Sequence, residues 1–176
     1  MSYIKNKLSV KDKDILNNIF DELENINIPT TFKTNPSNGA NHAVKTGATT
    51  QRHARQTLFG IYNGKKTKSN ELHPHMMKLF KNFIDLHQPD FKFKNVYVNR
   101  NVVSKKHLDS GNVGMSLLVG LGVYTGGRTI LHIKKPNGEY TPKKFHIKTN
   151  SIIFNGSEIP HESEHFKGVR YSLVFF

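Results

Sequence analysis

Beyond Pro89 the chain alternates short apolar segments with turn residues, and this pattern is the strongest constraint on its fold. Short segments rich in Val, Ile, Phe and Tyr that are bounded by Gly, Asn and Pro predict β-strands. The predicted strands cover residues 91–98, 115–123, 129–133, 144–148, 151–154 and 169–176. Strands of this length, joined by turns such as Pro136-Asn137-Gly138-Glu139, predict a β-sandwich or barrel.

Two helices are predicted before these strands. Ser9 and Asp12 resemble a capping box at the start of a helix over residues 9–26, where apolar residues recur on one face. A second helix is predicted over residues 71–87 and ends before Pro89. The residues expected on its inward face are Met76, Leu79, Phe80, Phe83 and Leu86.

The length of the chain limits its domain organisation. A chain of 176 residues with 36% hydrophobic content supports one compact core and is too short for two ordinary domains. We therefore expect a single α+β domain over residues 1–176, with a helical N-terminal part over residues 1–88 and a β core over residues 89–176. The polar stretch over residues 29–50 predicts a long loop.

The sequence contains no cysteine and ten histidines. A disulfide framework, a thiolate zinc site and a cysteine nucleophile are therefore excluded, and any metal must be held by imidazole and carboxylate groups. The formal net charge of +13 favours a polyanionic partner, nucleic acid before anionic lipid. Scattered lysine pairs are equally typical of a solvated surface, so charge alone leaves both interpretations open.

The N-terminus lacks the apolar run of a signal peptide, and the longest apolar stretch, residues 115–124, is too short to span a bilayer. We therefore expect a soluble, intracellular protein with no membrane partner. The sequence carries no information on its oligomeric state.

His107 and Asp109 are the first candidate metal ligands, because residues two apart on a β-strand point to the same side. His161 follows a predicted strand that ends near Gly156, so it can return to the same end of the sandwich. Two histidines and one carboxylate hold ferrous iron in oxygen-activating enzymes and leave positions open for a chelating cosubstrate and O2. The sequence thus predicts an iron site at His107, Asp109 and His161.

Arg170 and Ser172 share one face of the final predicted strand. An arginine within an apolar strand needs an anion, and its planar guanidinium can hold a carboxylate through two hydrogen bonds while the Ser172 hydroxyl adds a third donor. A five-carbon diacid such as 2-oxoglutarate would then reach from Arg170 to the iron. The alternative is an ion pair between Arg170 and an acidic neighbour, with His161 in a surface turn.

His107-x-Asp109, His161 and Arg170-x-Ser172 together look like the signature of the 2-oxoglutarate/Fe(II) dioxygenases, whose core is a double-stranded β-helix of the jelly-roll type. Over about residues 90–176 the chain also resembles the branch with the TET and JBP nucleobase oxygenases and their viral and algal relatives. The motifs that carry this likeness are Asn99-Arg-Asn101, His107-Leu-Asp109-Ser-Gly-Asn112-Val-Gly114-Met-Ser116, Gly120-Leu-Gly122-Val-Tyr124-Thr-Gly126-Gly127, Phe154-Asn-Gly156 and His161-x3-His165-Phe-x-Gly168-x-Arg170-Tyr-Ser172.

The resemblance implies a jelly-roll core with N-terminal helices packed on it, and Fe(II), 2-oxoglutarate and O2 as cofactor and cosubstrates. It implies hydroxylation of the 5-methyl group of thymine or 5-methylcytosine in nucleic acid, with DNA favoured over RNA. Asn112 matches the asparagine that contacts the target base, although a turn-capping role is an equally open interpretation. Lys105 and Lys106 precede the iron motif and are candidates for phosphate contacts.

The chain also departs from this branch. Without cysteine it lacks the zinc-binding region of animal TET enzymes, and it has no room for the DNA-binding domain of JBP proteins. Arg128 and His165 stand where relatives often carry an acid and a proline. Two alternatives remain: a 2-oxoglutarate-dependent hydroxylase of a protein side chain, prolyl or lysyl, and a catalytically silent nucleic-acid-binding domain. The expected location is the cytoplasm or nucleus, and the viral relatives make a virus-encoded protein one candidate.

Overall fold

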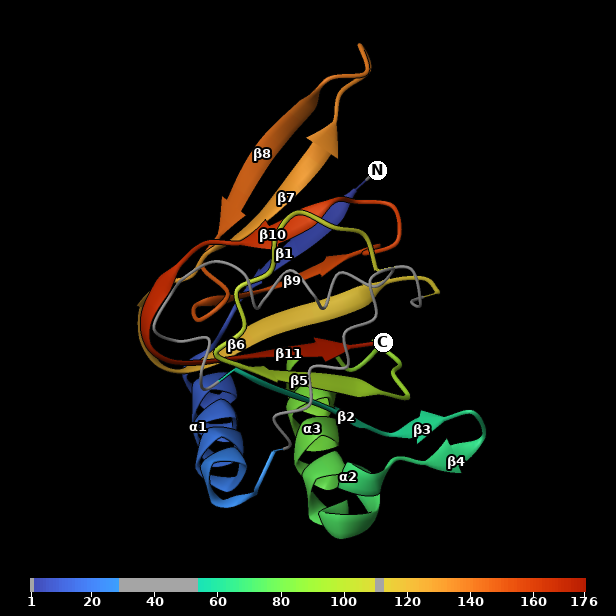
Figure 1. Cartoon of the computed structure of the whole chain (residues 1–176), viewed down its shortest axis with the longest axis vertical. Helices are drawn as coiled ribbons and strands as arrows, with labels where there is room; N and C mark the ends of the chain where they lie inside the picture. The colour runs from blue at the N-terminus through green and yellow to red at the C-terminus, as the bar shows by residue number, and fades with distance from the viewer. Residues whose placement is uncertain (1, 29–53, 110–112) are drawn as a thin grey trace.

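The computed structural model describes residues 2–28, 54–109 and 113–176, and Figure 1 shows how its elements are arranged. The elements in chain order are β1 (Tyr3–Lys7), α1 (Val10–Asn25), β2 (Arg55–Phe59), β3 (Ile61–Tyr62), β4 (Lys65–Lys66), α2 (Lys68–Leu72), α3 (Pro74–His87), β5 (Val96–Arg100), β6 (Ser116–Gly126), β7 (Thr129–Lys134), β8 (Tyr140–Phe145), β9 (Asn150–Phe154), β10 (His161–Ser163) and β11 (Phe166–Phe175).

Antiparallel sheets form the body of the protein. A large sheet has the strand order β1-β9-β6-β11-β5-β2, a small sheet has the order β10-β7-β8, and β3 pairs with β4. The inner faces of the large and small sheets share one apolar cluster. Its buried members are Leu118, Leu131, Phe145, Ile147, Ile152, Phe154 and Ile159. The fold is therefore α+β with a jelly-roll core, as the sequence predicts.

The helices cover the other face of the large sheet, as Figure 1 shows. Ser9 and Asp12 form the predicted capping box of α1, with the Asp12 backbone N–H donating to Ser9 Oγ and the Ser9 backbone N–H donating to Asp12 Oδ2. Leu16, Ile19 and Leu23 form the buried face of this helix. Each such side chain contributes about 2 kcal/mol relative to an exposed one, so this face holds α1 on the sheet.

The second predicted helix lies where it was expected, but it consists of two helices and one residue of its predicted inward face is exposed. A break at His73 divides it into α2 and α3, because Pro74 has no N–H to continue the first helix and suits the first position of a new one. Leu86, expected inside, is 45% exposed, whereas Ile84 is buried. Leu86 lies about 120° around the helix from the buried Phe80, which places it outside the apolar face.

Most predicted strands exist with shifted ends. The strand expected from residue 91 begins only at Val96, and the strand expected over residues 144–148 is β8, which ends at Phe145. The sequence does not predict strands β1, β2 and β10, because the first two are edge strands with few buried side chains and the third has three residues. No helix in the described part of the chain has the length and apolarity needed to cross a bilayer.

Candidate metal centre

The backbone places the two candidate histidines side by side. His107 and His161 form an isolated antiparallel bridge in which each backbone N–H donates to the other's carbonyl oxygen at 3.0 Å. The imidazole rings consequently leave the same side of the bridge, with centroids 4.4 Å apart. The Phe154 ring packs edge-on against His161, with centroids 5.1 Å apart. The backbone bridge between His107 and His161, the first residue of the short strand β10, therefore sets the distance between the two imidazoles. Sequence periodicity could not predict this strand.

Hydrogen bonds on the far side of each ring fix the imidazole tautomers. His107 Nδ1 lies 2.7 Å from the carbonyl oxygen of Lys105, and His161 Nδ1 lies 2.9 Å from that of Ile159. A carbonyl oxygen can only accept, so each Nδ1 carries a hydrogen and each neutral ring has its lone pair on Nε2. Metal-binding histidines are oriented in this way by their outer hydrogen bonds.

Asp109 completes the cluster, and Gly156 makes room for it. The Asp109 backbone N–H donates to the carbonyl oxygen of Gly156 at 2.9 Å, and a Cβ at position 156 would lie 2.5 Å from Asp109 Oδ2. Asp109 Oδ1 is 3.5 Å from His107 Nε2, and Asp109 Oδ2 is 3.6 Å from His161 Nε2. One ligand atom from each of the three residues lies within 4.8 Å of the others.

Mutual contact shifts the ionisation of Asp109 and of His107. Burial opposes the charge of Asp109, but its contacts with His107 and His161 outweigh burial and hold its pKa well below the usual range. For His107, hydrogen bonds to Asp109 and to the Lys105 carbonyl likewise outweigh burial and raise the pKa. Two imidazoles and an ionised carboxylate around one point match the ligand set of ferrous oxygenases, so the donor set fits Fe(II).

Arg170 is buried without an acidic partner in the part of the chain that the structure describes. Its guanidinium lies 5.8 Å from the ring centroid of Tyr124 and 5.7 Å from that of Phe166. Nη1 donates to the carbonyl oxygen of Val102 at 3.4 Å, while Nε and the Tyr124 hydroxyl have no hydrogen-bond partner among the described residues. Burial lowers the pKa of Arg170. Unsatisfied buried donors of this kind fit a site for an anion.

Ser172 belongs to a polar row that sequence reasoning did not identify. Gln56, Asn99 and Ser172 lie opposite one another on β2, β5 and β11, on the same face as Arg170. Gln56 Nε2 donates to Asn99 Oδ1 at 2.6 Å, and Asn99 Nδ2 donates to Ser172 Oγ at 3.3 Å. The only sequence signal for this row was Asn99 in the motif Asn99-Arg-Asn101.

Of the other candidate residues, Lys105 and Lys106 directly precede His107 in the sequence. Lys105 and Lys106 are exposed, and Lys106 Nζ lies 5.4 Å from the ring centroid of Tyr140. His165 is exposed and is not among the clustered ligands, so the structure favours His161 over it. Asn112 lies outside the described residues.

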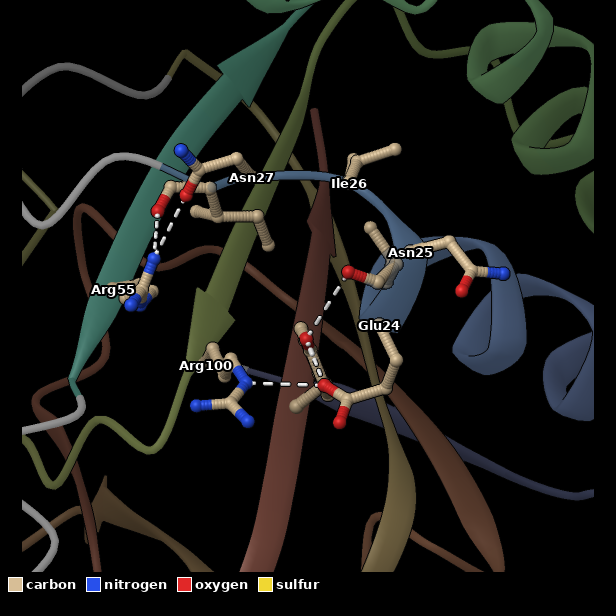
Figure 2. Close-up of a pocket in the computed structure, with 9 residues that line it drawn as sticks. Glu24, Asn25, Ile26, Asn27, Arg55 and Arg100 are labelled. Atoms are coloured by element: carbon tan, nitrogen blue, oxygen red, sulfur yellow. Dashed lines mark hydrogen bonds and ion pairs between the residues drawn. The ribbon is translucent and has the colours of Figure 1, made fainter.

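A separate pocket of about 440 Å³ lies on the opposite face of the large sheet, and Figure 2 shows its lining. Tyr171 alternates with Arg170 on β11 and therefore points to the helices rather than to the metal centre. Glu24 accepts from the Tyr171 hydroxyl at 2.6 Å and from Arg100 Nε at 3.1 Å. Arg55 Nη1 donates to Asn27 Oδ1 at 3.0 Å. This pocket is distinct from the metal centre.

Solved structures share the fold. A Pseudomonas putida prolyl-4-hydroxylase is 13% identical, with a TM-score of 0.51 over 98% of this chain and 91% of that one. OsALKBH1 is 12% identical, with a TM-score of 0.56 over 98% of this chain and 96% of that one. No protein-family model and no curated protein sequence matches the chain. These likenesses establish the architecture, and the chemistry must be argued from the residues.

Proposed function

We propose that the chain is a 2-oxoglutarate- and Fe(II)-dependent dioxygenase. The observation that carries this proposal is the convergence of His107, Asp109 and His161 on one point, in a fold whose buried Arg170 has no acidic partner among the described residues. The three clustered residues hold Fe(II), and Arg170 binds the distal carboxylate of 2-oxoglutarate together with Ser172. The fold shared with a prolyl-4-hydroxylase and OsALKBH1 is compatible with this chemistry.

Bound Fe(II) supplies the activation of O2, and the overall reaction converts a substrate C–H bond, O2 and 2-oxoglutarate into an alcohol, succinate and CO2. The protein presents the ligand atoms in the required state. In each neutral imidazole the Nδ1 hydrogen points to the carbonyl oxygen of Lys105 or Ile159, which leaves Nε2 as the atom that can bind a metal, and the low pKa of Asp109 keeps its carboxylate ionised. Three ligands on one side leave other positions open for the cosubstrates.

Arg170 and Ser172 act as the anchor for the cosubstrate. A guanidinium between the rings of Tyr124 and Phe166 is shielded from water, so a two-point hydrogen bond to a carboxylate is stronger there than at the surface. Asn99 orients the Ser172 hydroxyl through the polar row. This anchor explains why an arginine is buried in an apolar strand.

We further propose that the substrate is the 5-methyl group of thymine or 5-methylcytosine in DNA. The likeness of residues 107–116 to the nucleobase oxygenases and the net charge of +13 support this choice over a protein side chain. Asn112 donates to and accepts from the edge of a flipped base, and Lys105 and Lys106 contact phosphates.

The decisive experiment supplies the purified protein with Fe(II), 2-oxoglutarate and O2, together with oligonucleotides or with proline- and lysine-containing peptides. We expect succinate and a 5-hydroxymethylpyrimidine nucleoside, both measured by mass spectrometry, from the oligonucleotide reactions only. Hydroxylated peptide beside unchanged oligonucleotide would overturn the substrate assignment. Absence of succinate under every condition would overturn the dioxygenase assignment.

A further inference from the structure

The hairpin of β7 and β8 projects from the rest of the molecule, as Figure 1 shows. From residue 134 to residue 144 it carries four lysines and one glutamate, a net charge of +3 from four minus one. These charged side chains are all exposed. Their charges therefore face solvent and do not stabilise the core.

Tyr140 is an exposed aromatic residue on this hairpin, with 46% of its surface accessible. It lies opposite Lys134 in the register of β7 and β8, so both side chains share one face of the hairpin. Lys106 Nζ lies 5.4 Å from the centroid of the Tyr140 ring, and Lys106 immediately precedes His107. The hairpin surface is thereby joined to the segment that carries the metal centre.

Two of the four hairpin lysines, and the neighbouring Lys106, have no anionic partner among the described residues. In the described parts of the chain, no carboxylate oxygen lies within 4.0 Å of Lys106, Lys134 or Lys143. Lys144 differs, because its Nζ pairs with Glu164 at 2.9 Å. Lys135 approaches Glu139 at 3.8 Å in an exposed contact that contributes little. These lysines are therefore available to an acidic group of another molecule.

Protection of a sheet edge explains only part of this composition. Strand β8 is the edge of the small sheet, and Pro142, Lys143 and Lys144 are residue types that discourage pairing with another chain. That role does not account for Lys134 on the inner strand β7 or for the exposed Tyr140. An aromatic surface surrounded by unpaired cations is instead suited to nucleotides, since bases stack on the ring while lysines meet phosphates.

We propose that the basic ribbon, formed by Lys106, Lys134, Lys135, Tyr140 and Lys143, binds the phosphodiester backbone of the nucleic acid presented to the metal centre. This inference rests on the proposed function for the nature of the substrate. A two-stranded ribbon fits the major groove of a DNA duplex, and the same cations and ring also suit a single strand.

The test compares two triple variants that each remove three exposed lysines. Lys134→Ala, Lys135→Ala and Lys143→Ala remove ribbon charges, whereas Lys11→Ala, Lys13→Ala and Lys78→Ala remove charges from α1 and α3. Binding of a fluorescent 20-nucleotide oligomer, single-stranded or duplex, is measured by anisotropy over a range of salt concentrations.

We expect the ribbon triple to weaken binding by about tenfold or more and to reduce the salt slope by roughly 0.9 for each duplex phosphate that the protein no longer neutralises. The helix triple should change the dissociation constant less than twofold. Tyr140→Ala should weaken single-strand binding by about tenfold, because a base can no longer stack on the ring. Equal weakening by the two triples would overturn the proposal, as would binding of anionic lipid vesicles in place of both oligomers.

Failure of the ribbon proposal can be distinguished from failure of the dioxygenase proposal. Binding of Fe(II) and of 2-oxoglutarate, each measured by calorimetry, should be unchanged in the ribbon triple, which also reports that it is folded. Asp109→Ala should bind oligomers like the unmodified protein while forming no succinate. If the unmodified protein forms succinate but binds no oligomer, the ribbon assignment fails and the dioxygenase assignment stands.

Discussion

Two clusters in this protein combine histidine with aspartate, and they differ in which atoms remain available. In the first, His87 Nδ1 lies 3.0 Å from Asp12 Oδ2 and His87 Nε2 lies 2.7 Å from Ser151 Oγ. In the second, His107 and His161 each give Nδ1 to a backbone carbonyl and direct Nε2 toward Asp109. In the first cluster both ring nitrogens of the histidine are used within the cluster, although Asp12 Oδ1 has no hydrogen-bond partner among the described residues, whereas the second presents its ligand atoms to a common point.

Burial separates the two clusters further. The side chains of His87 and Asp12 are each 4% exposed, whereas that of Asp109 is 26% exposed. Asp12, His87 and Ser151 have the hydrogen-bond order of a nucleophilic triad, but Ser151 is completely buried and no substrate can reach it. The same residue types therefore hold α1, α3 and β9 together at one place and form a candidate metal centre at another.

The largest expected effect comes from Asp109→Ala. Removal of the carboxylate leaves two imidazoles, so we expect Fe(II) binding, measured anaerobically by calorimetry, to fall at least a hundredfold and succinate formation to cease. Normal succinate formation in this variant would show that Asp109 is not an iron ligand, and the second cluster would then no longer differ from the first in function.

Arg170→Ala should act on the cosubstrate rather than on the iron. Hydrogen bonds to a charged group contribute about 3 kcal/mol, so we expect the KM for 2-oxoglutarate to rise about a hundredfold while Fe(II) affinity is unchanged. Arg128→Ala is the matched control, because Arg128 is a half-exposed arginine paired with Glu164. An equal rise in both variants would contradict the role of Arg170 as the anchor.

His87→Ala should destabilise the fold without affecting chemistry. It removes a hydrogen-bond partner of the buried Asp12 and of Ser151 and a ring stacked on Phe83, so we expect a decrease of about 3 kcal/mol in the free energy of unfolding by urea. His75→Ala removes an exposed contact with Glu22 and should cost less than about 0.5 kcal/mol. A small effect of His87→Ala would show that the first cluster does not secure the helices.

The smallest expected effect is the pH dependence of the first cluster. Burial raises the pKa of Asp12, but hydrogen bonds from Ser9 and the proximity of His87 outweigh burial and leave it below the ordinary value of 3.8. A depressed folded-state pKa stabilises the protein above about pH 4, and this contribution disappears as the pH falls through the folded value.

Asp12→Asn removes this titration. We therefore expect the difference in unfolding free energy between the unmodified protein and Asp12→Asn to shrink as the pH falls below about 4, measured by urea unfolding at each pH. A difference that is constant with pH would contradict the low pKa of Asp12.

The sequence predicts the elements whose burial pattern is strong. The capping box at Ser9 and the strand β6 carry local signals, and both exist. Strand β1 escapes prediction because only Tyr3 and Asn6 of its five residues are even partly buried. The expected position of Leu86 is wrong because a list of apolar residues does not determine which side of a helix meets the sheet.

The site is predictable where its residues are close in sequence. The two-residue period of a strand pairs Arg170 with Ser172 on β11. The strand expected at His107 and Asp109 is wrong, because His107 forms only an isolated bridge and Asp109 lies outside any strand. The polar row of Gln56 and Asn99 is not predictable in this way, since neither residue carries a local signal for its partner on β11.

By itself the sequence determined the candidate ligand types, the absence of thiolate chemistry, the positive charge and the pairing of Arg170 with Ser172 on one strand face. Only the tertiary structure placed His161 beside His107, left Arg170 without an acidic partner among the described residues, and joined Asp12, His87 and Ser151 into a closed cluster. The physical reason is that backbone periodicity fixes directions over a few residues. Contacts between residues far apart in the sequence instead depend on how the two sheets and the helices pack.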